Sequence, residues 1–185
     1  KQHPEHKERY RRDRLNYLQG TESGLEAGER GLAAACWLAA GEVAEMQGIA
    51  ADTLELGRRL VEGIGETPTR DEIRAQTLYA WLQWGAGFLE EAHRQARMAW
   101  ERAKGGDPRL ECRTIAVLSS IIRRRGEPQE ALTMAERGLK LAQEAGDEAA
   151  AARQQINIGV TLQSIGRHRD ALPPLREGLD YARAC

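Results

Sequence analysis

The side chains that could carry out chemistry are few in this chain, and their spacing does not form a catalytic site. Among the four histidines, His3 and His6 stand at i, i+3, yet no third metal ligand accompanies them and the HExxH pattern is missing. Cys112 lies beside Arg113, whose charge would favour a thiolate, but no general base accompanies it. No nucleophile elbow, phosphate-binding loop or dinucleotide fingerprint occurs. We therefore expect no enzyme, catalytic residue, metal or cofactor; "HPEH" is interpreted as a flexible N-terminus or expression remnant, and Cys112 as a small apolar residue.

Composition favours helices and gives no general attraction to polyanions. Of the 185 residues, 41% are apolar and only 5% aromatic, with Ala and Leu dominant. The formal net charge of −1 indicates no pull on nucleic acid or anionic membranes. The basic stretch "HKERYRRDR" is interpreted as a solvated amphipathic helix rather than a nucleic-acid contact. Three cysteines without close spacing predict reduced thiols in a cytoplasmic protein, and no apolar run approaches the roughly 20 residues that cross a bilayer.

The chain repeats itself at a fixed interval. Residues 126–139 read "GEPQEALTMAERGL" and residues 166–179 read "GRHRDALPPLREGL". Stepping back from Gly126 by the same interval reaches Gly87 and then Gly48, so these glycines stand 39 or 40 residues apart. Seven positions before the glycine, all four copies have a small residue, and five positions after it stand Thr53, Ala92, Ala131 and Ala171. Because small side chains let helix backbones approach closely, we expect each period to be one helical hairpin with the glycine at its turn.

Capping signals place the helix boundaries. Thr69 with Glu72 forms a capping box, Asp107-Pro108 supplies an N-cap and a first-turn proline, and Gly146-Asp147 ends one helix and caps the next. No strand signal competes. We expect an accessory helix over about 4–19 in an N-terminal segment 1–24. Residues 25–185 are then predicted to form four hairpins, over about 30–63, 70–104, 109–144 and 148–183.

These repeats resemble the tetratricopeptide repeat. "CWLAAGEVAEMQG" (36–48) and "QINIGVTLQSIGRHRDAL" (155–172) are similar to its W-x2-L-G-x2-Y…G-x4-A pattern, and the resemblance covers about residues 30–183. The 39–40-residue spacing is similar to the long repeats of kinesin light chains, of Leu-Gly-Asn adaptors and of MalT-like bacterial regulators. The resemblance implies an all-α, right-handed α-solenoid of antiparallel hairpins, with the first helix of each pair lining a concave groove.

Some residues depart from the family pattern. Gln83 stands where an aromatic or Leu is expected, Thr53 replaces a small residue, and Gly57 replaces a bulky apolar one. Pro173-Pro174 falls within the first turns of the last helix, where proline removes a backbone donor, so we expect a kink or a delayed start there.

The side chains at groove-facing positions predict binding of a peptide or protein segment that is acidic beside an apolar anchor. Arginine forks suit carboxylates, and tryptophans supply anchoring area. The predicted binding residues are Arg74, Arg113, Arg153, Trp81, Trp84, Ser120, Arg123, Arg124, Asn157 and Gln163. Other interpretations stand beside this one: the arginines are solvated surface residues, the tryptophans fill the core against Phe88 and Trp100, and the 123–125 run complements a helix dipole.

We therefore expect a non-enzymatic binding module for a protein or peptide segment. The alternative is a sensor or oligomerisation domain of a larger bacterial regulator, which the start at Lys1 without methionine and the end at Cys185 suggest. Nucleic acid would then be reached only through a fused domain, and no membrane contact is expected. Because the last helix carries Leu172, Leu175 and Leu179, we also expect a homodimer through the C-terminal repeat.

Overall fold

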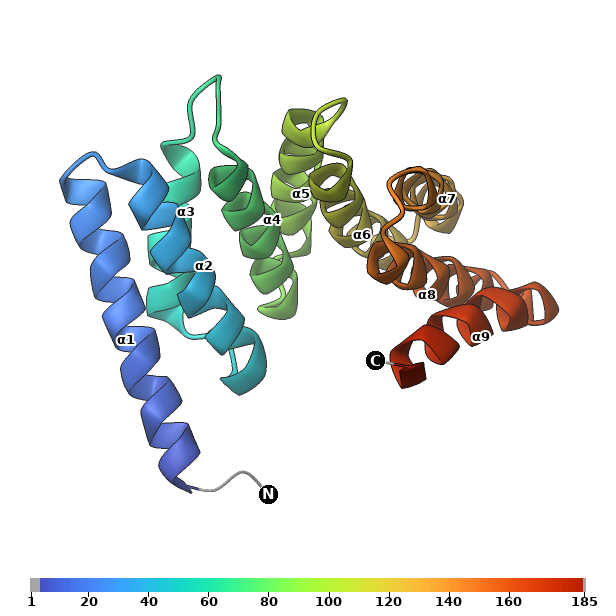
Figure 1. Ribbon diagram of the computed structural model, residues 1–185, viewed down its shortest axis with the longest axis horizontal. Helices are drawn as coiled ribbons and strands as arrows, with labels where there is room; N and C mark the ends of the chain where they lie inside the picture. The colour runs from blue at the N-terminus through green and yellow to red at the C-terminus, as the bar shows by residue number, and fades with distance from the viewer. Residues whose placement is uncertain (1–3, 185) are drawn as a thin grey trace. The chain divides into compact units, whose positions relative to one another are not determined.

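The protein is built of α-helices joined by short turns (Figure 1). The computed structural model describes the backbone of residues 4–184 and the side chains of residues 12–44 and 48–184. These described residues contain no strand, and their helices are α1 (Pro4–Glu26), α2 (Arg30–Gln47), α3 (Ala51–Glu62), α4 (Arg70–Gly85), α5 (Leu89–Ala103), α6 (Pro108–Arg124), α7 (Pro128–Glu144), α8 (Glu148–Ser164) and α9 (His168–Ala184).

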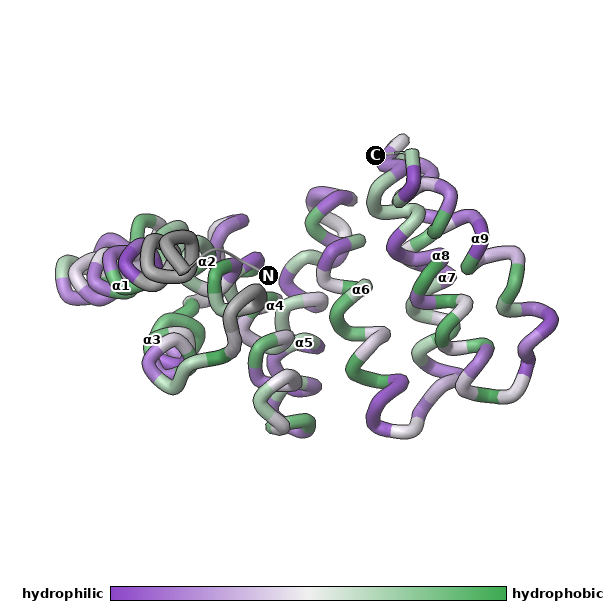
Figure 2. The backbone as a smooth tube through the Cα atoms, turned by 90° about the horizontal axis from the view of Figure 1, so that it is seen from below, coloured by the Kyte–Doolittle hydropathy of each residue, from purple (hydrophilic) through white to green (hydrophobic). Residues whose placement is uncertain are grey.

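The chain forms two compact units, Lys1–Gln95 and Ala96–Cys185, with the boundary inside α5. In the first unit α2 packs against α1, α3 and α4, and α3 also packs against α1 and α4. In the second unit α7 packs against both α6 and α8, α6 also contacts α8, and α9 packs on α8. Figure 2 shows hydrophobic residues recurring along α6 between hydrophilic stretches, as an amphipathic helix requires. The grouping into four hairpins remains a proposal.

The predicted caps and turn glycines are present. Thr69 Oγ1 accepts from the Glu72 N–H at 3.3 Å, and the Glu72 carboxylate accepts from the Thr69 N–H at 2.9 Å. Asp107 caps α6 and Asp147 caps α8. The turn glycines Gly48, Gly87, Gly126 and Gly166 all have positive φ, between 79° and 109°. Since side chains rarely adopt this conformation, glycine recurs at these four turns.

The first helix is longer than predicted. The expected end near residue 19 was wrong, because α1 continues through Gly20 and Gly24 to Glu26. These glycines do not break the helix; they let α2 approach. A Cβ added at Gly24 would lie 2.9 Å from the Ala33 backbone nitrogen, and one at Gly20 would lie 2.9 Å from Cys36 Sγ. Close packing against α2 therefore outweighs the low helix propensity of glycine.

The core of the first unit is organised around the buried Trp37 ring. Its indole N–H donates to the Thr53 carbonyl at 2.9 Å, and its ring meets Tyr79 edge to face with centroids 6.1 Å apart. Gly57 lies against both rings: an added Cβ would be 2.5 Å from Trp37 and 2.7 Å from Tyr79. The absence of a bulky residue at position 57 is thereby explained, because two aromatic rings already fill that space.

The second unit also depends on small residues at its helix crossings. A Cβ at Gly159 would lie 2.4 Å from Leu175, and one at Gly138 would lie 2.7 Å from the buried Gln154 side chain. The Gln154 amide donates to the Cys112 carbonyl at 3.0 Å, which fixes α8 against α6. Pro173 and Pro174 lie inside α9, yet the helix begins at His168, so the expected delay of its start does not occur.

A mostly buried ion pair joins the start of α2 to the start of α4. The Arg30 guanidinium donates to the Glu72 carboxylate at 2.8 Å and to the Leu60 carbonyl at 2.7 Å. Burial alone would raise the pKa of Glu72, but the Thr69 backbone N–H and the Arg30 guanidinium outweigh it and hold that pKa below its ordinary value. Glu72 is therefore ionised in the folded protein at neutral pH.

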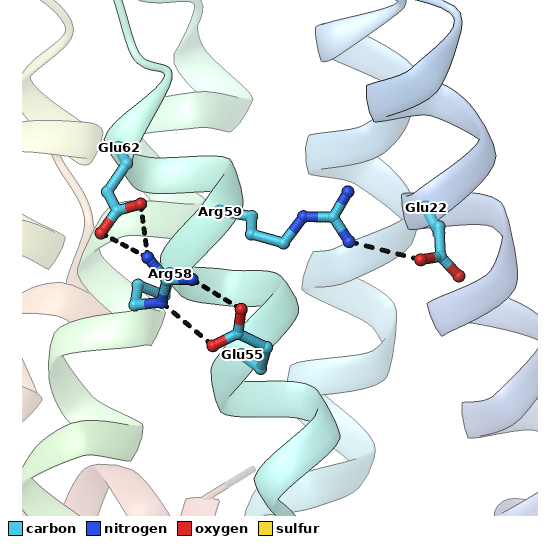
Figure 3. A network of polar contacts seen from close by, with 5 residues as sticks. All are labelled: Glu22, Glu55, Arg58, Arg59 and Glu62. Carbon is cyan, nitrogen blue, oxygen red and sulfur yellow. Dashed lines mark hydrogen bonds and ion pairs between the residues drawn. The ribbon is translucent and has the colours of Figure 1, made fainter.

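The exposed face of α3 is occupied by ion pairs (Figure 3). Arg58 binds Glu55 at 2.6 Å and Glu62 at 2.7 Å on the same helix, and Arg59 reaches Glu22 of α1 at 3.3 Å. The contact with Arg58 holds the pKa of Glu55 below its ordinary value. Because Arg58 is already bridged by two carboxylates, this face offers a ligand little uncompensated charge.

The Gly57→Ala substitution tests the packing of the first core. The added methyl group must displace the Trp37 or Tyr79 ring, so we expect the free energy of unfolding to fall by about 1–3 kcal/mol. Urea unfolding followed by circular dichroism measures the change. Gly31→Ala is the matched control: it also lies in a helix, nothing is within 4 Å of its Cβ, and stability should rise or stay equal. Equal effects of the two changes would contradict this packing.

The Glu72→Gln substitution tests the ion pair through its pH dependence. The carboxylate stabilises the fold above the ordinary glutamate value of 4.5, and this contribution is lost as the pH falls through the lowered pKa of the folded state. The wild type should therefore be more stable than the variant at neutral pH, with a difference that shrinks below that value. Chemical unfolding at several pH values measures it, with exposed Glu66→Gln as the one-carboxylate control. A pH-independent difference would contradict the assignment.

Candidate functional site

A pocket of about 380 Å³ opens beside the two predicted tryptophans. Trp81 and Trp84 stand three residues apart on α4, which places them on one helix face. Their ring centroids are 4.4 Å apart at an interplanar angle of 69°, and both rings are half-buried. The pocket is lined by Ala44, Gly48, Ile49, Trp81, Leu82, Trp84 and Gly85. Its wall is thus almost wholly apolar, with large aromatic surfaces that a partner can reach.

The alternative that these tryptophans fill the core against Phe88 and Trp100 is correct only in part. Trp81 packs against the first core, but Phe88 is 58% exposed and offers no core for the rings to enter. Trp100 is buried in the second unit, where Lys104 and Arg137 lie over its ring at 5.0 and 5.4 Å from the centroid. Trp84 lines the pocket.

Arg74, the third predicted residue of the first unit, has a partner on its own helix. Its guanidinium contacts Asp71 at 2.8 Å, and its side chain is half-buried. A cation near the start of a helix lies close to the positive end of the dipole, and Asp71 offsets that unfavourable interaction. A ligand carboxylate would have to compete with Asp71, so Arg74 is less available than its position in the sequence suggests.

Ser120 and Asn157 form a small polar network between α6 and α8. The Ser120 hydroxyl donates to the Ala116 carbonyl at 2.9 Å and approaches Asn157 Oδ1 at 3.4 Å. The Asn157 amide donates to the same carbonyl at 3.2 Å and to Ser119 Oγ at 3.4 Å. These two predicted residues are therefore brought together. The network fixes the Asn157 side chain in place and leaves it half-buried at the surface.

Arg123 is a half-buried cation one turn after Ser120. Burial, together with the neighbouring Arg124 charge, lowers the pKa of Arg123 from its ordinary value. None of the described carboxylates forms an ion pair with it, whereas Arg125 pairs with Glu127 at 2.7 Å. Arg123 and Arg124 lie in the last turn of α6, as the dipole interpretation of this run requires. That interpretation does not account for the burial of Arg123.

The remaining predicted residues lie on the same two helices. Arg113 is half-buried on α6, while Arg153 and Gln163 are exposed on α8. Gln154 donates a hydrogen bond to the Cys112 carbonyl, which holds α8 beside α6. Arg153 and Arg113 are the sequence neighbours of these two residues. The ten predicted residues thus fall into two groups, three in the first unit and seven in the second.

Sequence reasoning missed most of the pocket wall. Ala44 and Gly48 come from the end of α2, and Ile49 follows the turn glycine. Ile49 reaches so close to α4 that a Cβ at Gly85 would lie 2.7 Å from its Cδ1. One pattern in the sequence could have indicated Ile49: an apolar residue directly follows the turn glycine both here and at Gly87, where it is Phe88.

Cys112 has the surroundings of a structural residue. Burial and the nearby carboxylates of Asp147 and Glu111 raise the pKa of the Cys112 thiol to about 11. The thiol donates to the Gly138 carbonyl at 3.5 Å. The interpretation as a small core residue is confirmed. Among the described residues there is no cluster of potential metal ligands; the side chains of His3 and His6, named above for their spacing, lie outside that part. No helix among the described residues is long and apolar enough to cross a bilayer.

Helical hairpins with glycine turns and small residues at the crossings define a helical-repeat protein. Residues 112–184 match the family model of the tetratricopeptide repeat, and the resemblance seen in the sequence is confirmed over these residues. No curated protein matches the chain.

Solved structures extend the similarity over the whole length. Nearly identical repeats of a putative kinesin light chain from Podospora anserina are 15% identical with a TM-score of 0.66, and the match covers 96% of both chains. A MamA structure is 14% identical with a TM-score of 0.64, covering 100% of this chain and 97% of that one. Bacillus thuringiensis PlcR, solved with the peptide PapR7 and DNA, is 9% identical with a TM-score of 0.69, covering 94% of this chain and 66% of PlcR. This likeness confirms the all-α solenoid fold.

Proposed function

We propose that the chain is a non-enzymatic, cytoplasmic binding module for a protein or peptide segment. The observation that carries the proposal is the apolar pocket beside Trp81 and Trp84, which is open although large aromatic surfaces are normally covered in a folded chain. Rigid aromatic side chains on a helix bind a partner at a low cost in conformational entropy. The pocket is the proposed site for the anchor side chain of the partner.

The second unit supplies the proposed site for acidic groups of the partner. A half-buried guanidinium without a carboxylate partner is unfavourable, and an incoming carboxylate would relieve it. Arg123 is in this position, and the Ser120–Asn157 network lies one turn away on the same pair of helices. Arg113, Arg153, Arg124 and Gln163 extend the polar surface along α6 and α8.

The Arg123→Met substitution separates a binding role from a structural one. Salt-sensitive binding of acidic peptides, read by tryptophan fluorescence from a library of acidic and neutral peptides, should weaken at least several-fold. The unfolding free energy should not fall, because the charge that is removed is partly buried and unpaired. Arg167→Ala is the control: it removes one positive charge whose partner is Asp170, and binding should be retained.

The combined Arg74/Arg113/Arg153→Ala variant extends the test to the whole predicted set. Loss of salt-sensitive binding in this variant and in Arg123→Met supports an acidic partner. Unchanged binding in both, or binding that prefers neutral peptides, would contradict it. If only Arg123→Met weakens binding, the site for acidic groups of the partner is restricted to the Ser120–Asn157 surface.

A second candidate function is the sensor or oligomerisation domain of a larger regulator. The structural similarity to PlcR, which was solved with a peptide and DNA, favours it. In this case Leu172 and Leu179 would take part in self-association, since they are 52% and 46% exposed on α9.

The mass in solution tests this second candidate. Light scattering at micromolar concentration should give the mass of a dimer for the wild type and of a monomer for Leu172→Glu/Leu179→Glu, because charge on this face opposes apolar contact. A monomeric wild type would contradict the dimer. The same variant should keep peptide binding, so this test is independent of the pocket.

A further inference from the structure

The Trp81–Trp84 pocket is bounded by two segments that contain no basic residue. Neither residues 31–57 nor residues 75–92 include a Lys or Arg, although the chain has 27 of them. The same segments contain the carboxylates Glu42, Glu45, Asp52, Glu55, Glu90 and Glu91. Asp52, Glu55 and Glu91 are neutralised by arginines from outside these segments. Glu42 is exposed on α2, and no described cation pairs with it.

The pocket also lies at the negative ends of two helices. Gly48 caps the end of α2 and Gly85 is the last residue of α4, and both line the pocket. Neither helix has a basic residue in its last turn, a feature they share with α1, α7 and α8. The last turn of a helix carries partial negative charge, which a cation would complement. Nothing in the bounding segments supplies that cation.

The aromatic wall favours the same kind of ligand. The negative face of an indole ring attracts a cation placed over it, and tryptophan is the strongest of the aromatic side chains in this respect. Both rings line the pocket and are steeply inclined to each other. A rounded alkylammonium group can contact two such surfaces at once, while a planar guanidinium stacks on one of them.

We propose that this pocket binds an alkylammonium group, presented as a lysine or methylated lysine side chain of the partner. The inference rests on the proposed function, and it specifies the anchor: its apolar stem lies against Ile49 and Leu82, and its charge lies between the tryptophans and the helix ends. The partner then carries a basic anchor for the first unit and acidic residues for the second. Charge complementarity with two different surfaces gives such a partner its specificity.

Matched probes that differ only in charge test the proposal. Choline and its neutral isostere 3,3-dimethyl-1-butanol are titrated into ¹⁵N-labelled protein, and the indole N–H signals of Trp81 and Trp84 are followed. N-acetyl-trimethyllysine amide and N-acetyl-norleucine amide form the second pair. Each cation should bind about tenfold more tightly than its neutral counterpart, with the trimethyllysine probe tighter than choline because its stem is also bound.

Variants show whether the charge acts at this pocket. Trp84→Leu should remove the preference for the cation while keeping binding of the norleucine probe, and Trp84→Phe, which keeps an aromatic ring, should retain part of it. Glu42→Gln should reduce the preference several-fold without touching the rings. If Trp84→Leu fails to fold, Trp84→Phe and Glu42→Gln still decide the question.

Other outcomes would overturn the proposal in distinguishable ways. Equal or tighter binding of the neutral probes would show that the pocket binds an apolar anchor. The proposed function would then stand, and the preference for an alkylammonium group would be rejected. Choline binding as tight as trimethyllysine would indicate a free small cation in place of a partner side chain. Failure of all four probes, with peptide binding also absent, would reject the pocket as a site.

Discussion

The structure depends on helix crossings that are too close for any side chain. At Gly57 the space of a Cβ is taken by the Trp37 and Tyr79 rings, at Gly159 by Leu175, and at Gly24 by the backbone of α2. Each of these residues is flanked by well-packed apolar neighbours, so the cost of a glycine in a helix is offset by dispersion contacts and burial around it. Larger residues at these places would force the helices apart and open the cores.

The same constraint produces the candidate site. Ile49 follows a turn glycine with positive φ and reaches α4 at Gly85, where no side chain blocks it. The end of α2 thereby lies beside the C-terminal half of α4, with Trp81 and Trp84 on the open side. A pocket with an apolar wall and two helix C-terminal ends is thus a consequence of how closely the first unit packs. Its aromatic and electrostatic character follows from which residues the two segments contain.

The fold could be predicted from the sequence because its signals are local. The capping box at Thr69, the N-caps at Asp107 and Asp147, and the periodic turn glycines mark most helix ends within one or two residues. The end of α1 could not be predicted in this way. Gly20 and Gly24 have the local signal of a helix break, and only the tertiary contact with α2 reverses it. Local propensity was overridden by packing.

The site was less predictable because it depends on partners distant in sequence. Spacing identified Trp81 and Trp84, but the wall from α2 required the packed structure. The predicted arginines differ in surroundings: Arg74 pairs with Asp71, Arg153 is exposed, and Arg123 is half-buried without a described carboxylate. The repeat predicts where such a residue stands on its helix, but its neighbours decide whether its charge is available to a ligand.

Hydrogen exchange measured by mass spectrometry, on the free protein and on the protein with the tightest peptide from the library, tests the central claim most directly. We predict slower exchange on binding in segments 44–49 and 81–88, whose backbone amides lie around the pocket. Protection confined to the exposed face of α3, or no protection despite binding, would contradict it, because the partner would then bind elsewhere than at the tryptophan pocket.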